Sequence, residues 1–451
     1  MKTKKSIVAV FMLVVLVIAN LTVIPVSASS FETEEVANVK EVIDLFFSNY
    51  YLGIENTNET YSESVDRIQD LLIETDSTLQ FLAYYKWNKA FLDEFGLNYQ
   101  NCVMDIDYAE ILIQENTASV ELNFNMTYNY SFSPETESAI YRILYDFTLI
   151  VENGKWKISE IETDLMDYTR FQDELEAYIK PASKELMPYD GKDARVTFAK
   201  EAIDDFTNKK LTDIELIKQQ AVDSVAASAH LTGTSIVPSN NTNNSTRSTY
   251  SYNASNAAYY AMFYAEAPED DRLFYTASGG DCTNFVSQCV WAAYGGFTTY
   301  AESLTNIAAK IRMDRNEWYG GLMGGGGSPA WENVEQFYSY VTRSKTYGPN
   351  GTGINNNKLW SRYPNYSGSI PVGTVLQLRE GSSGNYRHSV YVTKIESSTA
   401  TDSTYGYFNR VLCSYHSNDH YNKSLMEVII GFGGSNCYMR GISFSSANFE
   451  S

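Results

Sequence analysis

The chain of 451 residues is longer than one hydrophobic core usually organises, so its length predicts two domains or more. A hydrophobic content of 44%, with 35 tyrosines and 22 phenylalanines, excludes an unstructured polymer. The formal net charge is −21, yet residues 240–451 hold 15 Lys and Arg against 16 Asp and Glu, so nearly all the excess acid precedes residue 240. Such a charge repels polyanions, which argues against nucleic acid and anionic surfaces as partners.

The N-terminus is typical of an export signal. Three lysines precede an apolar run from residue 7 to about 18, and Val26-Ser27-Ala28 fits cleavage after Ala28. The alternative is an uncleaved membrane anchor. We therefore expect residues 1–28 to be a signal peptide and the mature protein to be extracellular, either free or associated with the cell wall. Five cysteines in so long an exported chain do not form a disulfide framework, and their odd number leaves at least one free thiol in a monomer.

Residues 34–165 are predicted to form an α+β domain. Apolar residues recur at helical spacing up to about residue 97, and the period changes to two from residue 100 onward. Asn153-Gly154 between alternating apolar residues predicts a hairpin. This order resembles the cone-shaped domains similar to nuclear transport factor 2. The span has no histidine, so we expect a structural or interaction role for it.

Residues 166–230 are predicted to be a helical extension or spacer, and residues 231–249 a polar linker rich in Ser, Thr and Asn. A second domain is predicted from residue 250 to 451, with helices first and an antiparallel sheet second. Its predicted helices cover 253–267, 302–313 and 331–341, with a further helix within 279–296, and its predicted strands cover 375–378, 388–395, 407–416 and 425–431.

Cys282 stands in the first turn of the predicted helix that follows Gly279-Gly280-Asp281. The free N–H groups and the positive dipole end of a helix N-terminus lower the pKa of a thiol and favour the nucleophilic thiolate. The chain has four histidines, and alternation places one of them, His388, on the same strand face as Val390 and Val392. If that face meets the cysteine helix, His388 can take the thiol proton.

A third polar group would orient the imidazole of His388. The candidates are His416 at the end of the next strand, and Asn418 or Asp419 in the loop after it. An alternative is a zinc site formed by Cys282, His388 and His416, but the ligand spacing is unusual for zinc. We expect no metal and no cofactor.

Four segments resemble the putative amidase domain family of exported proteins from Gram-positive bacteria, over about residues 250–445. They are Gly280-Asp281-Cys282-Thr283-Asn284-Phe285-Val286-Ser287-Gln288-Cys289, Ser328-Pro329-Ala330-Trp331, Arg387-His388-Ser389-Val390-Tyr391-Val392-Thr393 and Ser414-Tyr415-His416-Ser417-Asn418-Asp419. The family is similar to the NlpC-type and CHAP groups of papain-like hydrolases. One departure is Gly373-Thr374, where relatives often have Gly-Asp.

The resemblance implies a papain-like or NlpC-like fold with Cys282 as nucleophile, His388 as base and acid, His416 as orienting residue and Asp281 as support at the start of the helix. The interval from His388 to His416 is long for the NlpC type, which leaves Asn418 and Asp419 open as the third residue. The expected function is an exported cysteine amidase or peptidase acting on cell-envelope amides such as peptidoglycan peptides. The alternatives are an acyltransferase with the same dyad and a non-catalytic extracellular binding protein.

Overall fold

The computed structural model describes residues 33–55, 61–183, 192–228, 248–268, 271–277, 280–310, 317–321, 326–363, 370–397 and 406–449. The predicted signal peptide over 1–28, His230 and residues 231–247 of the predicted linker lie outside these ranges. Below, residues 33–228 are called the N-terminal part and residues 248–449 the C-terminal part.

The N-terminal part begins with three helices, α2 (Glu34–Glu55), α3 (Tyr61–Gln69) and α4 (Asp76–Phe95). Local signals set the ends of α4, because Thr75 and Thr78 form a capping box and Gly96, at φ 63°, ends the helix in the left-handed region. Phe46 of α2 packs on Phe81 of α4 and on Phe147 of the sheet. The helices therefore cover one face of the strands that follow.

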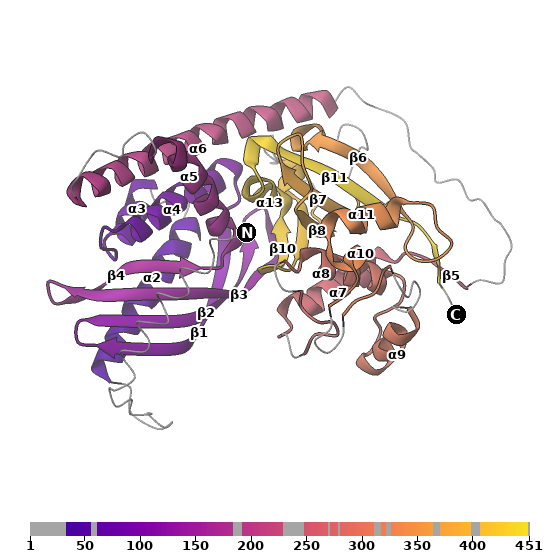
Figure 1. The fold of residues 1–451 in the computed structure, drawn as a ribbon, viewed down its shortest axis with the longest axis horizontal. Helices are drawn as coiled ribbons and strands as arrows, with labels where there is room; N and C mark the ends of the chain where they lie inside the picture. Colours follow the sequence, from indigo (N-terminus) through magenta and orange to yellow (C-terminus); the bar gives the residue numbers. More distant parts are fainter. Residues whose placement is uncertain are drawn as a thin grey trace.

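Four antiparallel strands come next, β1 (Tyr99–Gln114), β2 (Thr117–Tyr130), β3 (Ser133–Glu152) and β4 (Lys155–Thr163). Asn153 and Gly154 both have positive φ, as a tight hairpin turn requires, so the predicted hairpin is confirmed. The helical extension consists of α5 (Met166–Ser183) and α6 (Lys192–Ser228). The long helix α6 runs across the top of both parts in Figure 1, where Gln220 donates to the carbonyl of Ser435 at 3.1 Å.

The C-terminal part is also mixed α+β, as predicted. Its helices are α7 (Ala254–Glu266), α8 (Cys282–Ala293), α9 (Tyr300–Lys310), α10 (Pro329–Glu332), α11 (Val334–Thr342), α12 (Gly406–Asn409) and α13 (Leu425–Gly431). Its strands are β5 (Ser248–Tyr250), β6 (Gly351–Leu359), β7 (Val375–Glu380), β8 (His388–Ile395), β9 (Val411–Tyr415), β10 (Asp419–Ser424), β11 (Cys437–Phe444) and β12 (Ala447–Phe449), with short 3-10 turns at Trp360–Arg362 and Gly434–Asn436.

The prediction of a strand over 425–431 is wrong, because these residues form α13. Ser424 caps this helix by accepting a hydrogen bond from the N–H of Met426, and all seven helical residues are buried. A short run that is apolar or glycine apart from Glu427 has the same appearance in a buried strand and in a buried helix, so its period did not decide between them. The strand of this region is β10, directly before α13.

The two parts share one sheet. Its strand order is β1-β2-β3-β10-β9-β8-β7-β11-β6, with β4 pairing on β3. The junction is the β3–β10 pairing, in which Asp419, His420 and Tyr421 lie opposite Tyr141, Ile140 and Ala139. β4 pairs only with the later residues of β3, from Tyr145 onward, so the first half of this 20-residue strand is free to take β10.

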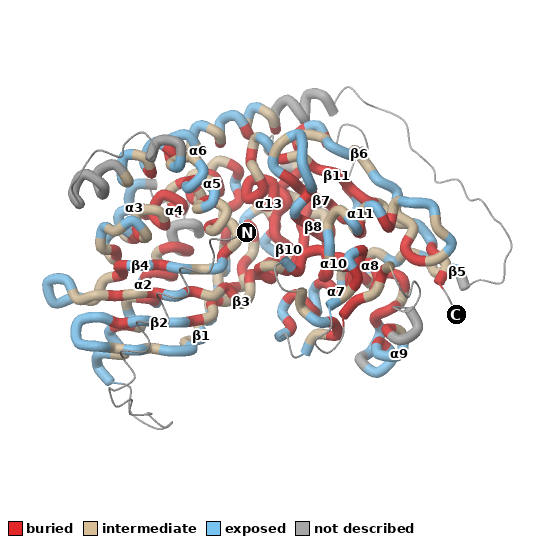
Figure 2. Tube along the Cα trace, in the orientation of Figure 1, coloured by how far each residue is buried: buried red, intermediate tan, exposed pale blue. Residues whose placement is uncertain are grey.

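Two cores lie on the two faces of the sheet in the C-terminal part. Val390 and Val392 of β8 belong to the larger core, which also contains α13 and the helices of the N-terminal part. Tyr391 of β8 belongs to the second core, with α7 and α8. Figure 2 shows that buried residues are concentrated where the two parts meet. Within the described ranges, the model has no helix that is both long and apolar enough to span a membrane.

Candidate active site

The candidate site is the first turn of α8, where the four segments noted in the sequence come together. Asp281 is the N-cap residue, and Cys282 is the first residue of the helix. The hydroxyls of Thr283 and Ser389 lie 3.0 Å apart, which joins the cysteine segment to the start of β8. Asn284 accepts a hydrogen bond from the indole N–H of Trp331 at 2.6 Å. These contacts bring the Ser328–Trp331 segment and the His388–Thr393 segment to one place.

Asp281 connects the fourth segment. Its Oδ2 lies 2.8 Å from Nδ1 of His416, and its Oδ1 accepts hydrogen bonds from the N–H of Ala277 and from the amide of Asn284, at 2.6 and 2.7 Å. Its backbone N–H donates to Oγ of Ser417 at 2.9 Å. The carboxylate of Asp281 therefore ties the start of α8 to the preceding loop and to the end of β9, and its supporting role in catalysis stays a prediction.

Cys282 is buried, with 6% of its surface exposed, and its Sγ lies 3.8 Å from Oγ1 of Thr283. Burial raises the pKa of the Cys282 thiol, and the N–H of Ser389 and the hydroxyl of Thr283 offset this only in part. The sequence predicts the opposite direction from the helix N-terminus alone. Desolvation is the largest cause of this raised pKa, which favours the protonated thiol in the described arrangement.

His388 lies on the other face of the sheet. The prediction that it shares a face with Val390 and Val392 agrees with the register, in which His388 is opposite Leu378 and Val390 is opposite Leu376. The expectation that this face meets Cys282 is wrong for this structure, because α8 packs on the face that carries Ser389 and Tyr391. The imidazole of His388 stacks on Phe432 instead, with ring centroids 4.5 Å apart. Burial lowers the pKa of His388 to about 3, with the charges of Arg170 and Lys423 contributing.

His416 lies on the α8 side of the sheet. Its ring packs on Phe285 of α8 with centroids 4.0 Å apart, and its Nε2 lies 3.2 Å from the carbonyl oxygen of Tyr264 in α7. A guanidinium nitrogen of Arg272 lies 3.3 Å from Nδ1 of the same ring. His416 therefore orients the start of α8 through Asp281, whereas the sequence predicts that it orients His388.

Asn418 and Asp419, the alternative third residues, face the N-terminal part. Asn418 accepts a hydrogen bond from the N–H of Met166 at 2.5 Å and donates to the carbonyl of Asp164 at 3.1 Å. Asp419 pairs with Arg272, and it also pairs with Arg142 of β3. Among the described residues, no hydrogen bond or ion pair joins either residue to His388.

Neither Arg142 nor Arg272 was predicted from the sequence as a residue of this site. Arg272 follows an acidic turn, and Arg142 lies within a strand of the other part, so neither position carries a local signal that could have identified it.

Metal binding finds no support among the described residues, where no group of three or more His, Cys, Asp or Glu side chains is arranged to hold an ion. The zinc alternative fails geometrically, because Cys282 and His416 lie on one face of the sheet and His388 lies on the other. Cys282, Cys289, Cys413 and Cys437 are free thiols.

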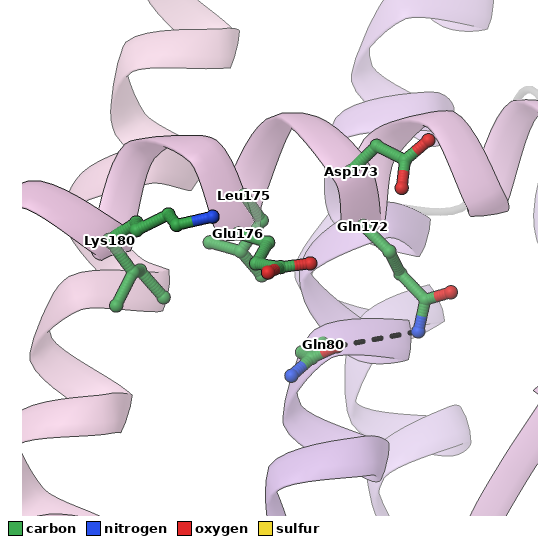
Figure 3. A pocket seen from close by; sticks show the side chains of 7 residues that line it. Gln80, Gln172, Asp173, Leu175, Glu176 and Lys180 are labelled. Carbon is green, nitrogen blue, oxygen red and sulfur yellow. Dashed lines mark hydrogen bonds between the residues drawn. The ribbon is translucent and has the colours of Figure 1, made fainter. Parts of the chain in front are cut away.

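A cavity of about 530 Å³ lies away from this site. It lies between α4 and α5 and is lined by residues such as Gln80, Gln172 and Glu176, as Figure 3 shows. Gln172 donates to Gln80 across it at 3.4 Å. No residue of the four segments lines this cavity, so it is not part of the candidate active site.

A family model described as "Putative amidase domain" matches residues 251–440. This span contains α8 and all four segments, and the family description indicates a hydrolase of amides for this part of the chain. No curated protein matches the chain.

Three solved structures resemble the chain at low identity. They are the intermembrane space region of the chloroplast protein ARC6 (14% identity, 28% of this chain and 94% of that chain, TM-score 0.22), a putative scytalone dehydratase from Novosphingobium aromaticivorans (14%, 28% and 82%, TM-score 0.20) and a putative calcium/calmodulin-dependent protein kinase type II association domain from Thiobacillus denitrificans (11%, 30% and 96%, TM-score 0.20). TM-scores this low do not establish a shared fold. The resemblance of residues 34–165 to nuclear transport factor 2 therefore stays a prediction.

Proposed function

We propose that this chain is an exported, cysteine-dependent amide hydrolase whose nucleophile is Cys282. One observation carries the proposal: within the span that the amidase family model matches, a cysteine opens a helix whose first turn is held by Asp281, His416, Ser389 and Trp331. The papain-like arrangement of helix and antiparallel sheet is part of the proposal. The substrate class that fits an exported amidase is an amide of the cell envelope, such as a peptidoglycan stem peptide.

In the proposed reaction the Cys282 thiolate attacks the amide carbonyl, and the C–N bond breaks as the amine leaves with a proton. Water then hydrolyses the thioester. The backbone N–H of Cys282, in the first turn of α8, is a natural donor to the oxyanion. His388 is the proposed base, and His416 positions Cys282 through Asp281.

This mechanism requires His388 to leave its stack on Phe432, since a thiol of raised pKa does not pass its proton to an imidazole whose pKa is about 3. His388 is the first residue of β8 and lies opposite Leu378 of β7, so its ring reaches the α8 face only if the backbone at this strand end leaves the pairing. We therefore interpret the described arrangement as a resting state.

The test uses the full chain without residues 1–28, incubated with muropeptides and peptide amides and analysed by mass spectrometry. We expect Cys282→Ala to abolish product, and His388→Gln to slow product formation by about a hundredfold or more, the usual contribution of a general base. Arg343→Ala is the control, because its ion pair with Glu317 is half exposed and involves no residue of the four segments. Product formation by Cys282→Ala at the wild-type rate refutes the mechanism.

The second candidate is a non-catalytic binding protein, which the buried, protonated thiol favours. Alkylation of Cys282 by iodoacetamide across pH separates the two. A hydrolase gives an alkylation profile that changes in His388→Gln, whereas a binding protein gives a thiol that titrates at or above the reference pKa of about 8.5 in both proteins.

A further inference from the structure

We propose that Arg142 of the N-terminal part is a positioning residue of the candidate active site, because it holds both elements that flank His416. These elements are the turn His416–Asp419, called here the 416–419 turn, and the C-terminal end of α7. The proposal deepens the proposed function, and it uses that function only for its activity readout.

Asp419 lies among positively charged side chains. Its side chain is 11% exposed, and its Oδ2 accepts hydrogen bonds from Nε of Arg142 at 2.7 Å and from Nη2 of Arg272 at 2.9 Å. Its Oδ1 lies 3.6 Å from Nε2 of His416. Burial acts to raise the pKa of Asp419, but the charges of His416, Arg272 and Arg142 hold that pKa below its usual range. Arg142 thus supplies part of the positive charge that keeps a buried carboxylate ionised beside His416.

Arg142 also contacts the C-terminal end of α7. Its guanidinium also donates to the carbonyls of Glu266 and Ala265, at 2.6 and 2.8 Å. These are the last residues of α7, and the carbonyl of Tyr264 directly before them contacts Nε2 of His416. One planar guanidinium therefore spans the carboxylate and the helix end between which Nε2 of His416 lies.

The backbone of Arg142 has a left-handed conformation. Its φ is 57°, in the left-handed region that is strained for a residue with a side chain. The residue sits at a register shift between β2 and β3, and its N–H donates to Oδ1 of Asn125 at 2.8 Å. It directly follows Tyr141, which pairs with Asp419 across the β3–β10 junction. A bulge at this point turns the side chain of Arg142 toward the 416–419 turn.

Two further bonds from the N-terminal part hold the same turn. Met166 and Asp164 bind the side chain of Asn418, and Ser417, at φ 100°, accepts a hydrogen bond from the N–H of Asp281. The 416–419 turn is therefore fixed from both sides, and Arg142 is the member of this set whose charge reaches His416 through Asp419.

The experiment measures the ring ¹⁵N chemical shifts of the histidines in the full chain at fixed pH. The chain has four histidines, so the His416 signals are assigned by their loss in His416→Gln. We expect Arg142→Ala to move the His416 signals and to leave those of His388 in place. Arg142→Lys, which keeps the charge without the fork, is expected to give a smaller change, and Arg343→Ala is expected to give none.

Unchanged His416 signals in folded Arg142→Ala overturn the proposal. If Arg142→Ala does not fold, Arg142→Gln takes its place with the same criterion, and circular dichroism establishes folding in each case. Where muropeptide hydrolysis is observed, Arg142→Ala is expected to lower kcat about tenfold at unchanged KM, and Arg142→Lys to restore part of it. A wild-type chain without hydrolysis refutes the proposed function and leaves the histidine measurement valid.

Discussion

A cysteine at the start of a helix predicts a lowered thiol pKa, whereas the pKa of Cys282 is raised. The sequence places Asp281 and Cys282 at the start of one helix because the Gly-Asp-Cys motif is local, but it assigns His416 to His388, whereas His416 contacts Asp281. It does not reveal the burial that raises the pKa of the thiol, since burial depends on packing from α7, α10 and β8. The side-chain face of His388 follows from strand alternation, but alternation alone does not tell which face a distant helix covers.

Glu427 gives a residue-scale prediction for stability against pH. Its carboxylate is buried between the two parts, where it accepts hydrogen bonds from Tyr130 at 2.7 Å and from Tyr99 at 3.1 Å. Burial raises the pKa of Glu427 from 4.5 to about 7, although the charge of Lys423 acts against the rise. The folded state thus holds this proton more tightly than the unfolded chain. Its stabilising contribution is complete below pH 4.5 and is lost as the pH rises through 7.

Glu427→Gln removes this titration and keeps an oxygen acceptor for the tyrosines. The free energy of unfolding of the wild type should therefore fall relative to the variant by about 3 kcal/mol between pH 4.5 and pH 7.5. Urea unfolding of both proteins across this range measures the difference, in which the titration of His388 and other shared groups cancels. Parallel pH profiles for the two proteins would contradict the prediction.

Among the elements, those with strong periodicity or local caps were predictable, and those defined by partners were not. The helices of the N-terminal part, the Asn153-Gly154 hairpin, α7, α8, β7 and β8 follow from pattern alone. β10 was missed because Asp419-His420-Tyr421-Asn422-Lys423-Ser424 is polar and becomes a buried strand only between β3 and β9. α13 was predicted as a strand because its residues apart from Glu427 are apolar or glycine and show no distinct helical period.

The bulge in β3 provides an element-scale prediction. Asn125→Ala removes the acceptor for the N–H of Arg142, so we expect the free energy of unfolding to fall by about 1–2 kcal/mol. Asn123→Ala is the matched control, because Asn123 lies two residues earlier on the same strand face and pairs in regular register with Leu144. It should change stability by less than about 0.5 kcal/mol. Equal losses in chemical denaturation of the two variants would show that the bulge has no special support.

The whole molecule is joined more closely than its sequence suggests. The composition of residues 231–249 predicts a polar linker at a domain boundary, and the described residues on either side share one sheet and one large core. The β3–β10 pairing joins residues about 280 positions apart, and no local pattern specifies a partner at that distance.

We therefore expect the two parts to unfold together. Pulsed hydrogen exchange read by mass spectrometry, at increasing urea, should give one midpoint for peptides from β2 and from β9. A shared midpoint follows because loss of either part exposes the core residues and strand edges of the other. Two separate midpoints would indicate independent domains and contradict the prediction.

β3 also has an electrostatic consequence. A strand of 20 residues is about 65 Å long, and both parts are hydrogen-bonded along it, so the parts cannot turn freely about a linker. Most of the net negative charge of the chain precedes residue 240 and is consequently held at a fixed orientation to the 416–419 turn and to Cys282. If the proposed hydrolysis is observed, we expect anionic substrates to react more slowly than neutral ones at low ionic strength, because this negative charge repels them.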